Sequence, residues 1–450
     1  MRDWILKLEQ NFLTSIYIII CLLVFEGLLR KILPTFIGNL IFFLKDIMCF
    51  ILLIFYLKNR FPRKDGIKKF NFIWTLLFLF FIPIFVVHAF YDPILVFWGG
   101  KLYLLYPIIA ICLYLGFESN PAKIIHLVLF VSFLIIPTGI VALIQNSLPA
   151  SHWLNTSVGG DSLERFSAAG FLRVSSTFSF TGQYSFFLVF ASAFYFGSFY
   201  VIKSARKSFY NNWFIRVLTG FLLILSVFVT GGRTAVFGAG LVLLGGILLQ
   251  FLKFPSKTFQ ANLIPIITLV VALTILPILF PDFFAAYQRR SEGGEDESNV
   301  KEVTGRVFGS YLNGLDIIAN ESIDKTVFGN GIGVMTNGSD KISSYAAGVR
   351  SQLWTENDFS TVSWEGGVYL IFLWYAFRLG VIFLCYKIFL KTEDRLYSCI
   401  ISFLLAYIII IGLTGTLSIQ PPLAIWWYIS IGTILIINKL NREKLINSNE

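Results

Sequence analysis

The stretch LYSCIISFLLAYIIIIGLTGT, residues 396–416, decides the fold class of this chain. It contains no Asp, Glu, Lys or Arg, and about 20 predominantly apolar residues are enough for an α-helix to cross the hydrocarbon core of a bilayer. Inside lipid the backbone must satisfy its own hydrogen bonds, which a helix does within a single segment. The stretch therefore predicts a membrane-spanning helix.

The same apolar character extends over the whole chain. Of its 450 residues, 56% are hydrophobic and 14% are charged, whereas a soluble domain carries about 25% charged residues. These values exclude a soluble enzyme, a disordered chain and a secreted disulfide scaffold. We expect an all-α, polytopic transmembrane helix bundle of about twelve spans. The predicted spans are 12–33, 38–57, 72–91, 96–116, 122–145, 183–203, 213–230, 233–252, 262–281, 366–388, 396–416 and 422–438.

Two segments are too long and too polar to be ordinary turns. They are 146–182 and 282–365, and the second contains an amphipathic helix at 307–320, whose predicted apolar face includes Phe308, Leu312 and Leu315. Loops of this length are usually functional. The chain thus divides into spans one to nine with the shorter loop (1–281), the long loop (282–365), and the last three spans with a tail (366–450).

Charge predicts the orientation of the bundle. Most of the 36 Lys and Arg residues lie in connections that alternate with short loops free of basic residues, such as 34–37 and 417–421. Cytoplasmic loops carry an excess of Lys and Arg. Both termini are therefore predicted to be cytoplasmic and both long segments to lie outside. The net charge of +10 is then an orientation signal and does not indicate a nucleic-acid partner.

Ionisable side chains gather in the outer half of the predicted spans. Such groups are costly in lipid and mark function by default, so they indicate a polar cavity open to the outside, with Glu26, Arg30 and Lys101 as candidate substrate-binding residues. The alternatives are an i,i+4 structural ion pair of Glu26 with Arg30 and snorkelling of Arg30 and Lys101 to the interface. The ionisable residues of the spans are Glu26, Arg30, Lys45, Asp46, Lys101 and, at mid-depth, Arg378, for which an interhelical contact is expected.

Two arginines stand next to glycine turns. In the motif TGGRTA (230–235), the guanidinium of Arg233 beside free helix N–H groups suits a phosphate or diphosphate. Arg306 follows Gly305 ahead of the amphipathic apolar pattern and is the second candidate. The alternative for Arg233 is an anchor at the lipid headgroups. The glycine run 329–333 is either a backbone nest for an anion or a tight turn.

Carboxylates lie where the long loop returns to the membrane. Glu356 and Asp358 are candidates for a general base that accepts a proton from a sugar hydroxyl. Glu365 opens the next span and either binds substrate or caps the helix. Arg173 precedes the hydroxyl-rich run 174–179 and is a candidate for holding a glycan or phosphate, or else a polar loop end at the headgroups. The three His and five Cys are scattered, so we expect no metal and no cofactor.

Taken together, these motifs resemble the bacterial O-antigen polymerase and ligase superfamily of integral membrane glycosyltransferases. The resemblance covers most of the chain in the right order, including the large outer loop before the last three spans. It rests on the segments 25–31, 45–46, 145–153, 173–180, 231–234, 305–306, 329–333 and 356–367.

The resemblance implies a metal-independent, inverting transfer of undecaprenyl-diphosphate-linked sugars on the outer face of the bacterial cytoplasmic membrane. Arg233 matches the arginine of the family's Ser/Thr-Gly-x-Arg turn, and Arg306 matches the Gly-Arg of its loop. By this resemblance the arginines hold the diphosphate of the donor, and a basic side chain of the long loop activates the acceptor hydroxyl. Ligases of the family typically carry a His in that loop. This chain has none between 282 and 365, which favours a repeat-unit polymerase.

Three other functions stay open at this point: a ligase of the same superfamily, a lipid-linked oligosaccharide flippase or other transporter, and a structural partner in polysaccharide export. Transporters often contain internal repeats, and this sequence has no clear repeat. The expected partners of a polymerase are the lipid-linked donor and acceptor glycans, membrane lipid, a chain-length regulator and a flippase.

Overall fold

The computed structural model describes residues 2–58, 65–117, 123–158, 172–199, 212–255, 299–353 and 357–449, together with Thr355 and single positions between 270 and 284. Within these residues the chain is helical and contains no β-strand. The predicted all-α class is therefore confirmed.

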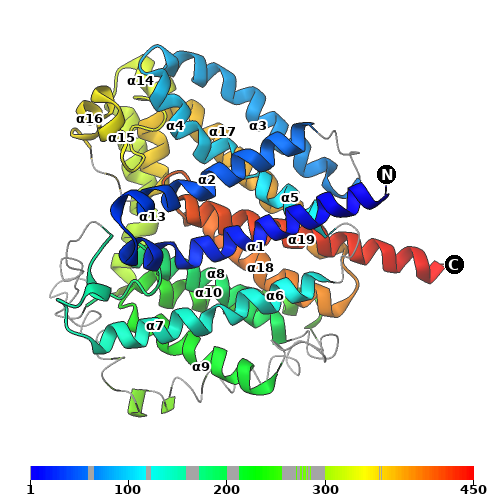
Figure 1. The fold of residues 1–450 in the computed structure, drawn as a ribbon. Coiled ribbons are helices and arrows are strands. Elements are labelled where there is room, and N and C mark those ends of the chain that lie inside the picture. Colours follow the sequence, from blue (N-terminus) through cyan, green and yellow to red (C-terminus); the bar gives the residue numbers. More distant parts are fainter. Residues whose placement is uncertain are drawn as a thin grey trace.

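The helices run back and forth along one bundle (Figure 1). Those of the first half are α1 (Arg2–Ile32), α2 (Thr35–Lys58), α3 (Asp65–Ala89), α4 (Pro93–Leu104), α5 (Ile108–Gly116), α6 (Ile124–Phe133), α7 (Ile135–Ser147), α8 (Thr181–Ser198), α9 (Trp213–Val229) and α10 (Arg233–Lys253). Those of the second half are α13 (Asn299–Ala319), α14 (Ile323–Phe328), α15 (Ser339–Ile342), α16 (Ser344–Arg350), α17 (Asp358–Lys391), α18 (Arg395–Thr414) and α19 (Pro421–Asn449).

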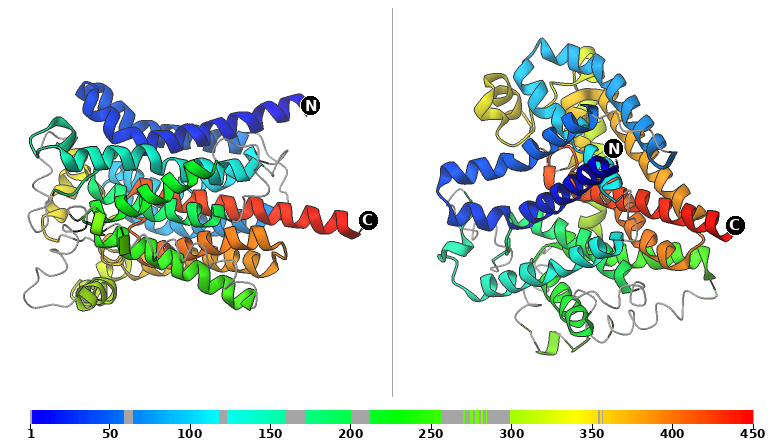
Figure 2. Two further views of the ribbon diagram at one scale, coloured as in Figure 1. Left: turned by 90° about the horizontal axis from the view of Figure 1, so that it is seen from below. Right: turned by 45° about the vertical axis from the view of Figure 1, so that its right-hand side comes forward.

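The two ends of the bundle differ in what they carry. The start of α1 and the end of α19 lie at the same end (Figure 2), which we call the termini end. The helices α14, α15 and α16 lie at the opposite end, which we call the loop end. The connections 33–34, 90–92 and 230–232 also belong to the loop end, as do the described parts of the connection between α7 and α8 (148–158 and 172–180), because an even number of traverses separates them from one another.

Eight helices are long and apolar enough to cross a membrane, or nine if the pair α4–α5, bent by 44°, counts as one span; this holds for the residues described above. The chain is thus a multi-pass membrane protein. The predicted spans 183–203 and 213–230 correspond to α8 and α9, which are not among the eight. The predicted span 262–281 lies largely outside the described residues. The number of twelve spans and their orientation therefore stay predictions.

The core of the bundle lies along α18 and α19. In the apolar stretches of α18 and α19, 78% and 94% of the residues are buried, compared with 17% and 22% in those of α2 and α3. The ring of Phe190 on α8 stacks on Trp426 of α19 with centroids 4.7 Å apart, and Trp427 Nε1 donates to the Ile408 carbonyl at 3.0 Å. The helices α2 and α3 stand at the periphery, so their exposed apolar side chains are the ones available to lipid.

One long helix, α13, crosses the loop end at a steep angle to the spans (Figure 1). Tyr311 Oη donates to the Leu413 carbonyl at 2.6 Å, and a Cβ on Gly314 would lie 2.3 Å from the ring of Phe359. The helix thus packs through its glycine side, with Ile318 buried, since only glycine allows so close an approach to Phe359. The predicted apolar face of the helix 307–320 is therefore wrong in part, because three of its residues do not pack on the bundle: Phe308, Leu312 and Leu315 are exposed.

Candidate functional site

A charged cluster joins α1 and α2 near the loop end. The carboxylate of Glu26 is bridged by two cations: Oε1 lies 3.1 Å from Arg30 Nη1, and Oε2 lies 3.2 Å from Lys45 Nζ. The hydroxyl of Ser179 is 3.3 Å from Arg30 Nη1 and 3.4 Å from Glu26 Oε1. The three charged groups leave one net positive charge in a largely buried place. The expected i,i+4 pair of Glu26 and Arg30 is present, extended by Lys45.

The segment 172–180 reaches this cluster by passing directly over α1. A Cβ on Gly27 would lie 2.0 Å from the backbone of Phe178, so only a glycine fits there. The Leu28 N–H donates to the Thr177 carbonyl at 2.8 Å, and the Thr177 hydroxyl donates to the Val24 carbonyl. The run of hydroxyl residues is therefore used to attach the segment to the first helix.

A buried glutamine holds the other side of the same segment. Gln145 Oε1 accepts from the N–H groups of Ser175 at 3.0 Å and Ser176 at 2.7 Å, and its Nε2 donates to the Leu154 carbonyl at 2.8 Å. Lys31 Nζ donates to that same carbonyl at 2.8 Å. Ser176 has a φ of 52°, in the left-handed region that favours glycine, so the backbone is forced to turn here. The segments 25–31, 145–155 and 173–180 thus form one hydrogen-bonded unit.

The start of the segment 172–180 lies against the glycine turn between α9 and α10. A Cβ on Gly232 would lie 2.9 Å from Ser185 Oγ and 3.6 Å from Arg173 Nη2, and a Cβ on Gly231 would lie 3.7 Å from Arg173 Cγ. Gly231 has a φ of 57°, which requires a glycine. Arg233 is the first residue of α10, whose N-cap Gly232 offers no side-chain hydrogen bond. Arg173 and Arg233 therefore flank a helix N-terminus with its positive dipole end.

The glycine run 329–333 has a packing role. The Asn330 and Gly331 N–H groups donate to the carbonyls of Trp364 and Glu365 at 2.8 and 3.0 Å. Gly333, with a φ of 91°, sits so close to α4 that a Cβ would lie 2.6 Å from the Leu95 carbonyl oxygen. Of the two uses expected for this run, the structure favours the tight turn.

Glu365 and His88 hold that turn in place. Glu365 is 1% exposed; its Oε2 accepts from Tyr103 Oη and its Oε1 from the Met335 N–H, both at 2.9 Å. His88 Nδ1 accepts from the Ile332 N–H at 3.0 Å, and its Nε2 lies 2.6 Å from the Phe328 carbonyl. The structure thus places Glu365, a candidate substrate-binding residue, inside a buried structural network.

Asp358 is also buried. It is 2% exposed and pairs through Oδ2 with Arg378, which is 0% exposed, while Oδ1 accepts from the N–H and hydroxyl of Ser418 at 2.8 and 2.7 Å. Twenty residues of straight helix would separate the two charged residues by ~30 Å. They meet because α17 breaks at Gly367, with φ 57° and ψ −157°. An ion pair so enclosed differs from the open general base expected at Asp358.

The other candidate base and one candidate arginine are not placed. Glu356 lies outside the described residues, and so does the side chain of Arg306, whose backbone belongs to α13. The structure therefore brings together Glu26, Arg30, Arg173 and Arg233 through 172–180 and holds Glu365 and Asp358 in separate buried networks.

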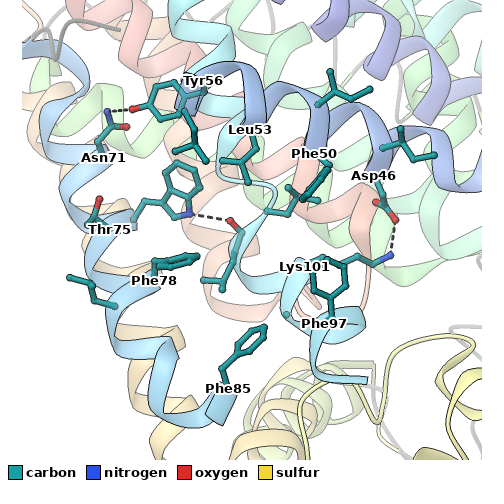
Figure 3. Close-up of a pocket in the computed structure, with 18 of the residues that line it drawn as sticks. Asp46, Phe50, Leu53, Tyr56, Asn71, Thr75, Phe78, Phe85, Phe97 and Lys101 are labelled. Carbon is teal, nitrogen blue, oxygen red and sulfur yellow. Dashed lines mark hydrogen bonds and ion pairs between the residues drawn. The ribbon is translucent and has the colours of Figure 1, made fainter. Parts of the chain in front are cut away.

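Lys101 is paired at the mouth of a long groove between α2, α3 and α4 (Figure 3). Lys101 Nζ lies 2.7 Å from Asp46 Oδ2, and Tyr106 Oη donates to Asp46 Oδ1 at 2.6 Å. The groove has a volume of about 1340 Å³. Its walls are mostly apolar, and the polar contact Tyr56–Asn71 lies towards the termini end. A large apolar groove with a charged end suits an amphipathic ligand.

Some of these polar residues escaped the sequence reasoning. Tyr103 and Tyr106 lie inside an apolar run and look like interfacial aromatics. They lie two and five residues after Lys101, spacings that do not share a helix face with it, so the sequence contains no local signal for their contacts with Glu365 and Asp46. Among the described residues there is no group of three or more His, Cys, Asp or Glu that would hold a metal ion. No known family model and no curated protein matches this chain.

Proposed function

We propose that this protein is a membrane glycosyltransferase that polymerises undecaprenyl-diphosphate-linked oligosaccharide repeat units into a surface polysaccharide. The transfer is metal-independent and inverting, and takes place on the outer face of the bacterial cytoplasmic membrane, which is the loop end. The polysaccharide is an O-antigen, a capsule or an exopolysaccharide.

The observation that carries this proposal is the path of the segment 172–180. Its middle is attached to α1 next to Arg30 and Lys45, and its start lies against the Gly231–Gly232 turn ahead of Arg233. Cationic groups from three distant parts of the sequence thus gather at one end of the bundle. Ionisable groups gathered at one site of a membrane protein mark a functional site by default, and this net positive cluster suits an anionic substrate.

The chemistry needs this kind of charge. When the acceptor hydroxyl attacks the anomeric carbon of the donor sugar, the bond to the diphosphate breaks and its electron pair leaves with the diphosphate. Guanidinium groups bind phosphate oxygens bidentately, and fixed positive groups stabilise the leaving charge without reorganisation. Arg173 and Arg233, with the N-terminus of α10, are the proposed holders of the diphosphate.

The groove between α2, α3 and α4 is proposed to hold the lipid part of the donor. Its length runs along the spans from the Asp46–Lys101 pair, and its walls carry exposed apolar side chains such as Phe50, Phe78 and Phe97 (Figure 3). A prenyl chain can lie against these side chains within the membrane, where contact is by van der Waals packing.

The base that accepts the proton of the acceptor hydroxyl is proposed to be Glu356. Asp358 is engaged in the ion pair with Arg378, so of the two candidate carboxylates Glu356 is the one left for this role. Arg306 is proposed to assist from α13. The lack of a His in 282–365 favours the polymerase over the ligase.

The test is complementation of a deletion strain with Arg173→Ala and Arg233→Ala, read on gels of surface polysaccharide. We expect strains with either variant to lose long-chain glycan while the variant protein inserts into the membrane at normal levels, because each substitution removes a guanidinium group that binds the diphosphate. The matched control is Arg350→Ala, which removes an arginine of α16 at the same end that pairs with Asp340 instead. The control should keep full-length polymer.

The gel also separates the alternatives. Single-unit glycan in the deletion strain indicates a polymerase, and bare core indicates a ligase. Absence of any exported glycan indicates a transporter such as a flippase. Full-length polymer in both arginine variants would overturn the proposed function.

A further inference from the structure

A second, smaller pocket lies at the termini end, between α3, α17 and α19. Its volume is about 680 Å³. Four basic side chains line it: Lys68 and Lys69 from the start of α3, Lys387 from the end of α17, and Arg442 from α19. No Asp or Glu is among the described residues that line it. The three helices are far apart in sequence, so only the fold brings these charges together.

Charge makes this pocket a site for an anion. Lys69, Lys387 and Arg442 are exposed, and exposed Lys and Arg side chains are cationic at neutral pH. Lys387 Nζ lies 4.2 Å from the centroid of the Phe383 ring, so this ammonium group is held against the pocket wall. Basic pockets between membrane helices on the cytoplasmic side bind anionic lipid headgroups.

The rest of the pocket is apolar and points to a lipid in place of a soluble anion. Its wall includes Phe72, which is 63% exposed, and Phe383, which is 55% exposed. Gly380 gives this wall its depth, since a Cβ there would only just reach Ile73, at 3.7 Å. A free phosphate ion would leave these side chains uncovered, whereas acyl chains that run along the helices cover them.

We infer that this pocket binds an anionic phospholipid of the inner leaflet, with its phosphate among Lys69, Lys387 and Arg442 and an acyl chain against Phe72 and Phe383. The lipid links α3, at the periphery, to α17 and α19, in the centre. Lys68 and Phe72 also line the larger groove, so the bound lipid closes that groove at the termini end. This site is independent of the proposed transfer reaction.

The test is native mass spectrometry of the full chain in detergent, titrated with dioleoyl-phosphatidylglycerol or dioleoyl-phosphatidylcholine. We expect the wild type to bind the anionic lipid more tightly. Each Lys or Arg near a headgroup contributes about fivefold in affinity, so the triple variant K69Q/K387Q/R442Q should bind it roughly a hundredfold more weakly. The control K58Q/K123Q/K391Q removes the same charge from exposed residues of the same end that do not line the pocket.

A second variant tests the apolar half. Gly380→Leu keeps all four cations and fills the space beside Ile73, so it should lose the anionic lipid as well. Four results overturn the inference: equal affinity of the wild type for the two lipids, equal loss in the control, unchanged binding by Gly380→Leu, or displacement of the lipid by an equal concentration of glycerol 3-phosphate. The last result identifies a site for a free phosphate.

Discussion

The buried ion pair of Asp358 and Arg378 allows a quantitative test of what these charges do. Both side chains are almost fully enclosed, and Asp358 also accepts two hydrogen bonds from Ser418. Removal of one partner from such a pair leaves an uncompensated buried charge and costs about 3–5 kcal/mol. We therefore expect Asp358→Asn alone and Arg378→Met alone each to lower the free energy of unfolding by about that amount.

The double variant should recover most of this loss. The introduced asparagine side chain would keep an oxygen for the two Ser418 donors, and the introduced methionine would fill the guanidinium site without charge. Replacement of a buried pair by neutral groups of similar volume is often near neutral, so we expect a net loss of about 0–2 kcal/mol and a coupling energy of several kcal/mol. Unfolding in mixed detergent–SDS micelles, followed by tryptophan fluorescence, measures all four corners of the cycle.

The same four proteins test the role of Asp358 in the reaction. If its role is structural, the double variant folds and makes polymer. Additive losses in the cycle would refute the pairing argument. A double variant that folds as well as the wild type but makes no polymer would show that Asp358 or Arg378 takes part in the transfer.

Two further perturbations test the loop end. Gly27→Ala should lower the free energy of unfolding by about 1–3 kcal/mol and reduce the amount of polymer, because the added Cβ overlaps the backbone of Phe178 and displaces the segment 172–180. The control is Gly240→Ala on α10, where no atom lies within 4 Å of the added Cβ, and this variant should not lower the free energy of unfolding in the same micelles. Asp92, the N-cap of α4, has its pKa lowered from its usual 3.8 by hydrogen bonds from the Ser343 hydroxyl and from the Leu95 and Ile94 N–H groups. Its charged form therefore stabilises the fold above about pH 4 and this contribution is lost as pH falls through the folded pKa. Asp92→Ala should lower the free energy of unfolding by about 1 kcal/mol at pH 7. In chemical unfolding experiments, this difference in free energy between variant and wild type should shrink below about pH 4. A difference that stays constant down to about pH 2 would contradict the prediction.

Local composition was enough to predict the helical class. Each span is a run of about 20 apolar residues, and in lipid such a run has few alternatives to a helix. The paired charges were also visible in part, because Glu26 and Arg30 lie one helical turn apart. Helix boundaries were less accurate. The tenth predicted span begins at residue 366, whereas α17 begins at Asp358, because the polar stretch before Gly367 is also helical and folds back onto the bundle.

Which polar groups meet was decided by the tertiary structure. The partner of Arg378 is Asp358, on the same helix, and the contact depends on a positive φ at Gly367 that sequence spacing does not reveal. The third member of the Glu26 cluster comes from α2, and the segment 172–180 links that cluster to the Gly231–Gly232 turn.

The sequence by itself thus determined a helical membrane protein and predicted that the ionisable residues within its spans gather towards one end, since hydropathy and i,i+4 spacing are local properties. Only the tertiary structure decided which of those residues form closed networks and which gather around the α10 N-terminus. It also decided that four basic residues of the termini end line one pocket. The contacts between these distant polar groups depend on glycines at which two backbones approach closely, and such an approach is a property of how the helices pack.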